Sequence, residues 1–380
     1  LNYDEVRRLL GADNRNRALD YYSAIDPDKK KLTLCHWKDA NGITPDMERK
    51  ATSNGVIEVE GGRIIHQKYI NGFDLGFGRD MYVYQKSSGD VAAWVVNYPF
   101  IEAMEDKSDA FATVVMEYAP LNGVGERFTR FYTYVESLNE NLSENYLVDN
   151  YQIPADDHCF NTNGTPKKNR GLDPGDFRRK LSYGLDFDGR GYRYMPEACT
   201  VCHGGIGLDT DLASNGDVQA NFLPWDIHNL FFDDQNFEQR PNSKVGGEYR
   251  EFLLENSEDT YKALNESVLQ TRTLTGADPI RELIHGWYGS DEQANTIPES
   301  ATFDSQFVPD GWAQSPEMYT KVVGPMCRTC HISRTEESGL AFTSEDQFSA
   351  YINQNNRGLI EDQRVMPLAR LTMDNLWAEI

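Results

Sequence analysis

The sequence has no apolar run that approaches the roughly 18 residues needed for a membrane-spanning helix, so we expect no membrane span. Basic residues are also scarce: 37 Lys and Arg stand against 60 Asp and Glu, for a formal net charge of −23. An acidic surface of this size repels nucleic acid and anionic lipid, so neither is an expected partner. A redox partner with a basic face, a saline habitat and simple solubility are all compatible with this charge.

Cysteine and histidine are scarce as well, with 6 Cys and 7 His in 380 residues. Four of the cysteines nevertheless fall into two copies of one short pattern. Residues 199–203 read C-T-V-C-H, and residues 327–331 read C-R-T-C-H. This C-x-x-C-H pattern is the attachment signature of c-type haem. Two chance copies in a chain of this composition have a probability of roughly one in a million.

The chemistry of attachment explains the order and spacing of these residues. Two thiols add across the vinyl groups of one porphyrin, and the adjacent histidine ligates the iron. We therefore expect two covalently bound haem c groups, haem 1 on Cys199, Cys202 and His203 and haem 2 on Cys327, Cys330 and His331. Structural zinc is the alternative, because paired C-x-x-C also binds zinc, but the repeated histidine favours haem. A thioredoxin-like motif is disfavoured because neither pair lies in a βαβ pattern.

The segment around the second motif resembles a class I cytochrome c domain over roughly the last 65 residues. Tyr319, Val322 and Val323 supply the apolar face of a helix that leads into the motif. Met366 is followed by Pro367. In that family a Met-Pro pair supplies the distal ligand. The resemblance therefore implies that Met366, 35 residues after His331, is the sixth ligand of haem 2. Ordinary core packing is the alternative role for this methionine.

The sixth ligand of haem 1 stays open at this point. No Met-Pro pair follows the first motif at a suitable distance, and Met195 lies only four residues before Cys199, too close to reach the opposite haem face. The alternatives are an iron without a sixth protein ligand and four candidate side chains, namely Met81, His228, His66 and His158.

Arg79 and Met81 close a glycine-rich segment, residues 71–81, which we expect to be an irregular loop. Arg79 is a candidate partner for a haem propionate. We expect the β-rich region that contains this segment to cover the distal face of haem 1.

The residue patterns predict an α+β fold that begins with a β-rich region, residues 1–194. Residues 92–98, 112–118 and 128–135 are short β-branched and aromatic runs separated by Gly, Asn and Pro signals. Strands are therefore expected there.

Helical spacing dominates after the first motif, at residues 247–271 and 278–288, and Asp278-Pro279 is typical of a helix start. We expect residues 195–311 to form a helical haem 1 segment within the same domain as 1–194. Residues 290–314 have the composition of a linker, and residues 312–380 are expected to form a small all-α, cytochrome c-like haem 2 domain.

The two remaining cysteines are Cys35 and Cys159. Haem attachment of this kind takes place outside the bacterial cytoplasm, where disulfides are permitted. We therefore expect a Cys35–Cys159 disulfide, with two buried free thiols as the alternative. The protein is expected to be periplasmic or secreted, with a lipid anchor at the outer membrane left open. The chain opens on Leu1 with a polar and charged stretch, so we expect any secretion signal to have been removed or to lie outside this sequence.

Together these features favour a carrier that transfers electrons between redox partners. A six-coordinate haem has no place to bind substrate, so its chemistry is outer-sphere. The alternative is a di-haem oxidoreductase, similar to a peroxidase, in which haem 1 binds a small molecule. The 128 residues between the motifs differ from the di-haem peroxidase pattern. A binding module that docks a redox enzyme or a polysaccharide through its aromatic residues is a third reading.

Overall fold

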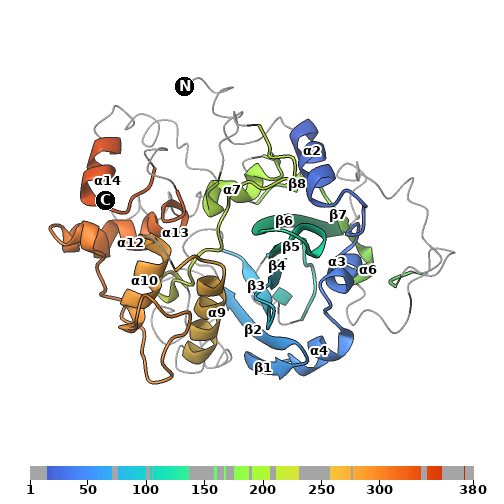
Figure 1. Ribbon diagram of the computed structural model, residues 1–380, viewed down its shortest axis with the longest axis horizontal. Coiled ribbons are helices and arrows are strands. Elements are labelled where there is room, and N and C mark those ends of the chain that lie inside the picture. The colour runs from blue at the N-terminus through green and yellow to red at the C-terminus, as the bar shows by residue number, and fades with distance from the viewer. Residues whose placement is uncertain are drawn as a thin grey trace.

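The computed structural model describes residues 15–70, 76–99, 103–104, 106–136, 158–160, 167, 175–187, 191–205, 211–230, 257–274, 277–334, 340–352 and 372. Within these ranges, an antiparallel sheet in the first half of the chain is followed by helices (Figure 1). The predicted α+β class is therefore confirmed. Among the described residues, no helix is long and apolar enough to cross a membrane.

The main sheet is a meander in which seven strands lie side by side in chain order, each antiparallel to the next. They are β1 Gly55–Val59, β2 Gly62–Ile70, β3 Gly78–Lys86, β4 Val91–Tyr98, β5 Ala112–Pro120, β6 Arg127–Glu136 and β7 Arg179–Leu181. A two-stranded sheet pairs β8 Gly184–Leu185 with β9 Arg193–Tyr194. The three predicted strand runs correspond to β4, β5 and β6.

The α-helices are α2 Arg15–Ile25, α3 Leu34–Ala40, α4 Pro45–Lys50, α6 Gly175–Arg178, α7 Glu197–His203, α9 Glu258–Gln270, α10 Pro279–Tyr288, α11 Pro316–Met318, α12 Gly324–Met326, α13 Arg328–His331 and α14 Glu345–Tyr351. A π-helical turn, η8 Tyr319–Val323, joins α11 to α12. Short 3-10 turns are η1 Leu121–Gly123, η3 Ile227–Asn229 and η7 Asp310–Trp312.

Helix α10 begins where the sequence predicts it. The Asp278 carboxylate accepts a hydrogen bond from the backbone N–H of Ile280 at 3.0 Å, and Pro279 occupies the first helical turn. Gly289 ends the helix in the left-handed conformation, with φ of 56°.

Side chains from alternate positions of each central strand pack into two different cores, because successive residues of a strand point to opposite faces. On β3, Tyr82 and Tyr84 belong to a first core with α2, α3 and α4, whereas Met81 and Val83 belong to a second core with α9 and α10. Figure 1 shows α3 and α4 on one side of the sheet and α9 and α10 on the other. Both faces of the sheet are therefore buried.

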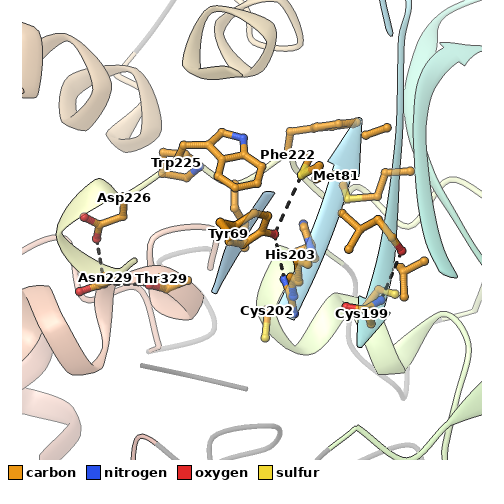
Figure 2. A pocket seen from close by; sticks show the side chains of 18 of the residues that line it. Tyr69, Met81, Cys199, Cys202, His203, Phe222, Trp225, Asp226, Asn229 and Thr329 are labelled. Atoms are coloured by element: carbon orange, nitrogen blue, oxygen red, sulfur yellow. Dashed lines mark hydrogen bonds between the residues drawn. The ribbon is translucent and has the colours of Figure 1, made fainter. Parts of the chain in front are cut away.

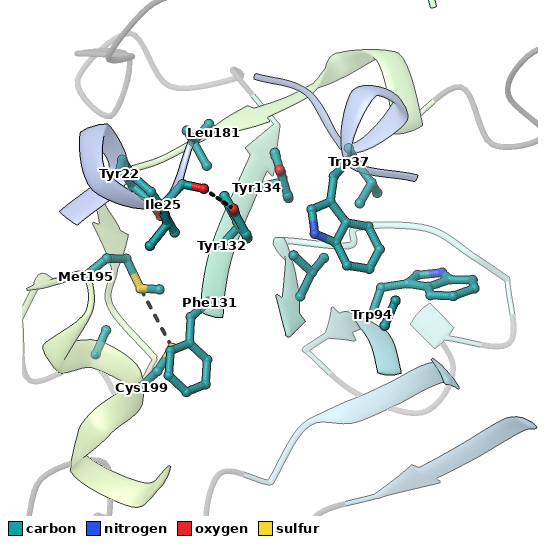
Figure 3. Close-up of a cluster of buried hydrophobic side chains, with 14 of the residues drawn as sticks. Tyr22, Ile25, Trp37, Trp94, Phe131, Tyr132, Tyr134, Leu181, Met195 and Cys199 are labelled. Carbon is teal, nitrogen blue, oxygen red and sulfur yellow. Dashed lines mark hydrogen bonds between the residues drawn. The ribbon is translucent and has the colours of Figure 1, made fainter. Parts of the chain in front are cut away.

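The first core is dominated by aromatic rings (Figure 3). Tyr22 stacks on Tyr132 with ring centroids 6.0 Å apart, and Trp37 meets Trp94 edge-on at 6.2 Å. The fully buried Met195 also belongs to this core, where its sulfur lies 3.7 Å from the Cys199 thiol. The aromatic core therefore extends to the start of the first C-x-x-C-H motif.

The structure differs from the sequence expectations at two segments. Arg79 and Met81 were expected at the end of an irregular loop, but they lie in β3, paired with Tyr69 and Gln67 of β2. The apolar and β-branched residues of β3 and of the paired strand β2 favour a strand here more than the preceding glycines favour a loop. Residues 290–314 contain only one short 3-10 turn, yet they bury Ile297 and Trp312, unlike a solvated linker. The domain boundaries at 194 and 311 stay predictions.

Candidate haem-binding site

Helix α7 carries the first motif and places its three side chains on the wall of one cavity. The helix ends at Gly204, whose φ of 73° favours glycine. Cys199, Cys202 and His203 line a cavity of about 210 Å³ together with residues of the main sheet. The two thiols and the imidazole therefore face a shared space, as one bound macrocycle requires.

The sheet forms the opposite wall of this cavity. Side chains from one face of the central strands line it, namely Tyr69, Arg79, Met81, Ala93, Val95, Asn97, Val114 and Met116. The segment after α7 closes one end with Phe222 and Trp225 (Figure 2). Most of this lining is apolar, which suits a porphyrin ring.

Hydrogen bonding fixes the orientation of His203. Its Nδ1 lies 2.8 Å from the carbonyl oxygen of Asn221, an acceptor, so Nδ1 carries the proton and donates it. Nε2 is then the nitrogen with a free lone pair, which is the form of histidine that ligates iron. Burial, with a smaller contribution from the nearby charge of Arg79, lowers the pKa of His203 to about 4. The imidazole is therefore neutral at pH 7.

His331 in the second motif has the same arrangement. Its Nδ1 lies 2.7 Å from the carbonyl oxygen of Leu340, and its ring stacks on Phe342 with centroids 3.9 Å apart. Burial lowers the pKa of His331 to about 4. Both motif histidines therefore present a neutral ring with Nε2 as the available ligand atom.

Burial sets the protonation state of the first cysteine in each motif. It raises the pKa of Cys327 to about 12 and that of Cys199 further, so both are thiols at pH 7. Thiols are the groups that add across the vinyl groups of a porphyrin. Among the residues that the structure describes, no group of three or more His, Cys, Asp or Glu is arranged to hold a metal ion.

Two of the residues predicted from the sequence lie in the cavity of the first motif. Met81 is on its wall, and the Tyr69 hydroxyl lies 3.9 Å from the Met81 sulfur (Figure 2). Arg79 also lines the cavity and donates a hydrogen bond to the Tyr69 hydroxyl at 3.2 Å. The strand β3 therefore brings Arg79 and Met81 to the same space as His203.

The other candidates for the sixth ligand lie elsewhere. His66 is buried on the opposite face of the sheet, stacked on Tyr82, and its Nε2 lies 2.6 Å from an Asp80 carboxylate oxygen. His158 is largely exposed and pairs with Asp39 at 2.8 Å. The side chain of His228, and the whole of Met366, lie outside the described residues.

The structure adds residues that the sequence did not single out. Asp226 and Asn229 are buried on the cavity wall, and both contact the second motif. The Arg328 guanidinium donates to the Asp226 carboxylate from Nη2 at 2.7 Å and from Nε at 2.8 Å. The only sequence signal for the pair of Asp226 and Arg328 was that residues 222–226, soon after the first motif, differ from the usual cytochrome pattern.

The predicted disulfide is confirmed, since Cys35 is bonded to Cys159 across 124 residues. The other four cysteines form no disulfide. Comparison with protein-family models, with curated proteins and with solved structures finds no match to this chain. The functional interpretation therefore depends on the two motifs and their surroundings.

Proposed function

We propose that this protein is a di-haem c-type cytochrome that transfers electrons between redox partners outside the cytoplasm. The observation that carries the proposal is the shared state of His203 and His331. Each donates Nδ1–H to a backbone carbonyl and keeps Nε2 available, and each is adjacent to the two cysteines of its motif. The same arrangement at both C-x-x-C-H motifs is what attachment of haem c requires.

Each motif would hold one haem c through thioether bonds of its two cysteines and an axial bond from its histidine, and the haem supplies one-electron redox chemistry. The backbone carbonyls of Asn221 and Leu340 orient the two imidazoles and increase their basicity. The apolar sheet wall limits the access of water to the first site. Arg79 lies on that wall and would be a cationic partner for a propionate.

For haem 1 we propose Met81 as the sixth ligand. Met81 lines the same cavity as Cys199, Cys202 and His203, and β3 delivers it from the opposite wall. His228 is the second candidate. For haem 2 we propose Met366, within a C-terminal segment of the class I cytochrome c type.

One observation favours the alternative, a di-haem oxidoreductase with haem 1 as its catalytic site. The Oδ1 atoms of Asp226 and Asn229 are buried and accept no hydrogen bond from the described residues. Both residues line the cavity of the first motif. Two such acceptors beside a redox centre would suit a small substrate that donates hydrogen bonds.

Carbon monoxide distinguishes the carrier from the enzyme, because it binds ferrous haem only where the sixth position is open. The carrier predicts weak or no binding in the native protein and one new binding site after Met81→Ala. Rapid binding at one haem of the native protein, together with peroxide turnover by the native protein, would support the enzyme. The matched control is Met116→Ala, a second methionine on the same wall, which should not open a site.

The compartment and the partner follow from two further features. The Cys35–Cys159 disulfide fits an oxidising compartment, so we propose a periplasmic or secreted location. The net charge of −23 fits a redox partner with a basic face.

A further inference from the structure

The two C-x-x-C-H motifs, 128 residues apart in the sequence, touch in the structure. The Sγ atoms of Cys202 in α7 and Cys330 in α13 are 3.3 Å apart. In each motif this is the second cysteine, the one next to the histidine. The contact therefore joins equivalent positions of the two attachment sites.

Hydrogen bonds on one side of this contact hold the motifs together. The Ser333 hydroxyl lies within hydrogen-bond distance of the backbone carbonyls of both Cys202 and Cys330. The Arg334 guanidinium donates to the carbonyl of Val201, inside the first motif. Ser333 and Arg334, two and three residues after the second motif, are thus bonded to the backbone of the first.

Gly204 allows the two segments to approach this closely. A Cβ atom at this position would lie 2.1 Å from the carbonyl oxygen of Ser333. Such a contact is far too short, so any side chain larger than hydrogen would push the two motifs apart.

A second set of contacts joins the second motif, and the residues just before it, to Asp226 and Asn229. The Asn229 amide donates to the carbonyl of Gly324 and to the Thr329 hydroxyl, both at 3.0 Å. The buried Arg328–Asp226 ion pair lies beside them. The second motif is therefore bonded on both sides to the chain segments that build the first site.

We propose that the sulfur contact between Cys202 and Cys330 joins the two haem groups into one electronically coupled pair, which stores two electrons. The inference rests on the proposed function. Each sulfur would be bonded directly to a vinyl-derived carbon of its own haem, so the contact between Cys202 and Cys330 would bring the two haems close together. One electron would then pass from a reduced haem to an oxidised one, which oxidises the first and reduces the second, with no other reactant and no proton needed.

Circular dichroism in the Soret region tests this inference without any activity assay. Two coupled haems give a paired positive and negative band, whereas two independent haems give the sum of their separate spectra. The native protein should show the paired band. Two single-haem variants, Cys199→Ala/Cys202→Ala and Cys327→Ala/Cys330→Ala, should each lose it, and their summed spectra should not reproduce the native one.

A finer test uses two glycines whose φ angles are nearly equal. Gly204→Ala introduces a side chain between the motifs and should reduce the paired band while both haems stay attached. Gly42→Ala is the control, because Gly42 has a φ of 72°, close to the 73° of Gly204, but a Cβ there would contact nothing within 4 Å. It should leave the band unchanged.

The outcomes separate the inference from the proposed function on which it rests. Two covalent haems with additive spectra would overturn the coupling and leave the cytochrome assignment intact. Absence of covalent haem would overturn the cytochrome assignment itself. Should the single-haem variants fail to fold, half-reduction of the native protein decides the matter. The paired band of the oxidised protein should then fall to well below half of its amplitude, because every molecule with one oxidised and one reduced haem loses it, the two haems absorbing at different wavelengths. A band that falls only in proportion to the fraction of haem reduced contradicts the coupling.

Discussion

The buried ion pair between Asp226 and Arg328 is expected to be a major support of the region between the two motifs. Both side chains are 5% exposed. Burial opposes the positive charge of Arg328, but the adjacent Asp226 carboxylate raises the pKa of the guanidinium above its usual value. Asp226 is also held by the Asn229 amide at 2.9 Å. Loss of the carboxylate would leave a buried cation without its counter-charge.

The expected cost follows from this burial. Removal of one partner of a buried ion pair destabilises a protein by about 3 to 5 kcal/mol, because the remaining charge stays buried without compensation. The near-isosteric Asp226→Asn variant should therefore lose stability of that order. Replacement of both charges, in Asp226→Leu/Arg328→Met, should restore much of it, because an apolar pair of similar volume has no charge to bury.

Urea unfolding at pH 7, followed by tryptophan fluorescence, measures these changes. The control is Glu317→Gln, which removes a pair with Lys321 whose side chains are 79% and 71% exposed, and it should leave the unfolding midpoint unchanged. A loss below about 0.5 kcal/mol in Asp226→Asn, as for an ordinary surface substitution, would refute the reasoning. A double variant less stable than Asp226→Asn would refute it as well.

Three further predictions concern stability and association. Cys35→Ser/Cys159→Ser opens a loop of 124 residues and should lower the free energy of unfolding by about 5 kcal/mol if chain entropy accounts for the effect of the disulfide. Urea unfolding measures this loss, and equal stability of the variant and the native protein would contradict it. Glu117 is buried, which opposes its charge, but Lys31 and Arg130 lower its pKa from 4.5 to about 2. This lowered pKa contributes on the order of 3 kcal/mol above pH 4.5, and the contribution is lost as the pH falls through about 2. The free energy of unfolding of the native protein should therefore fall by this amount between pH 5 and pH 2, whereas that of Glu117→Gln should not. Unfolding free energies of the two proteins that change in parallel over this pH range would argue against the prediction. The rate of electron transfer with a basic redox protein should fall as ionic strength rises, because the net charge of −23 is screened beyond about 10 Å at 0.1 M salt. A rate that is flat or rises with salt would indicate that the charge serves solubility or habitat.

The strands were predictable because their signal is local. Residues 92–98, 112–118 and 128–135 alternate between two buried faces, and this makes them rich in β-branched and aromatic residues. The start of α10 was predictable for the same reason, since Asp278 and Pro279 act on the adjacent turn. The Cys35–Cys159 disulfide followed from counting, once four of six cysteines were assigned to haem.

Other features depended on contacts between distant segments. Nothing near Asp226 in the sequence indicates that its partner is Arg328, 102 residues away. The contact between Cys202 and Cys330 is equally invisible to spacing. The glycines before Arg79 suggested a loop, but strand pairing with β2 and β4 decided the conformation. Sequence patterns identified the chemistry of each motif, and only the fold brought the two motifs together.

The mass of the intact, denatured protein shows directly whether haem is covalently attached, because thioether bonds survive denaturation whereas a ligated metal ion does not. The protein should be produced in a host that attaches haem c. A di-haem cytochrome should have the mass of the polypeptide plus two haems, falling by one haem in Cys199→Ala/Cys202→Ala and by one in Cys327→Ala/Cys330→Ala. The polypeptide mass alone, with zinc present in the native protein, would contradict the cytochrome assignment.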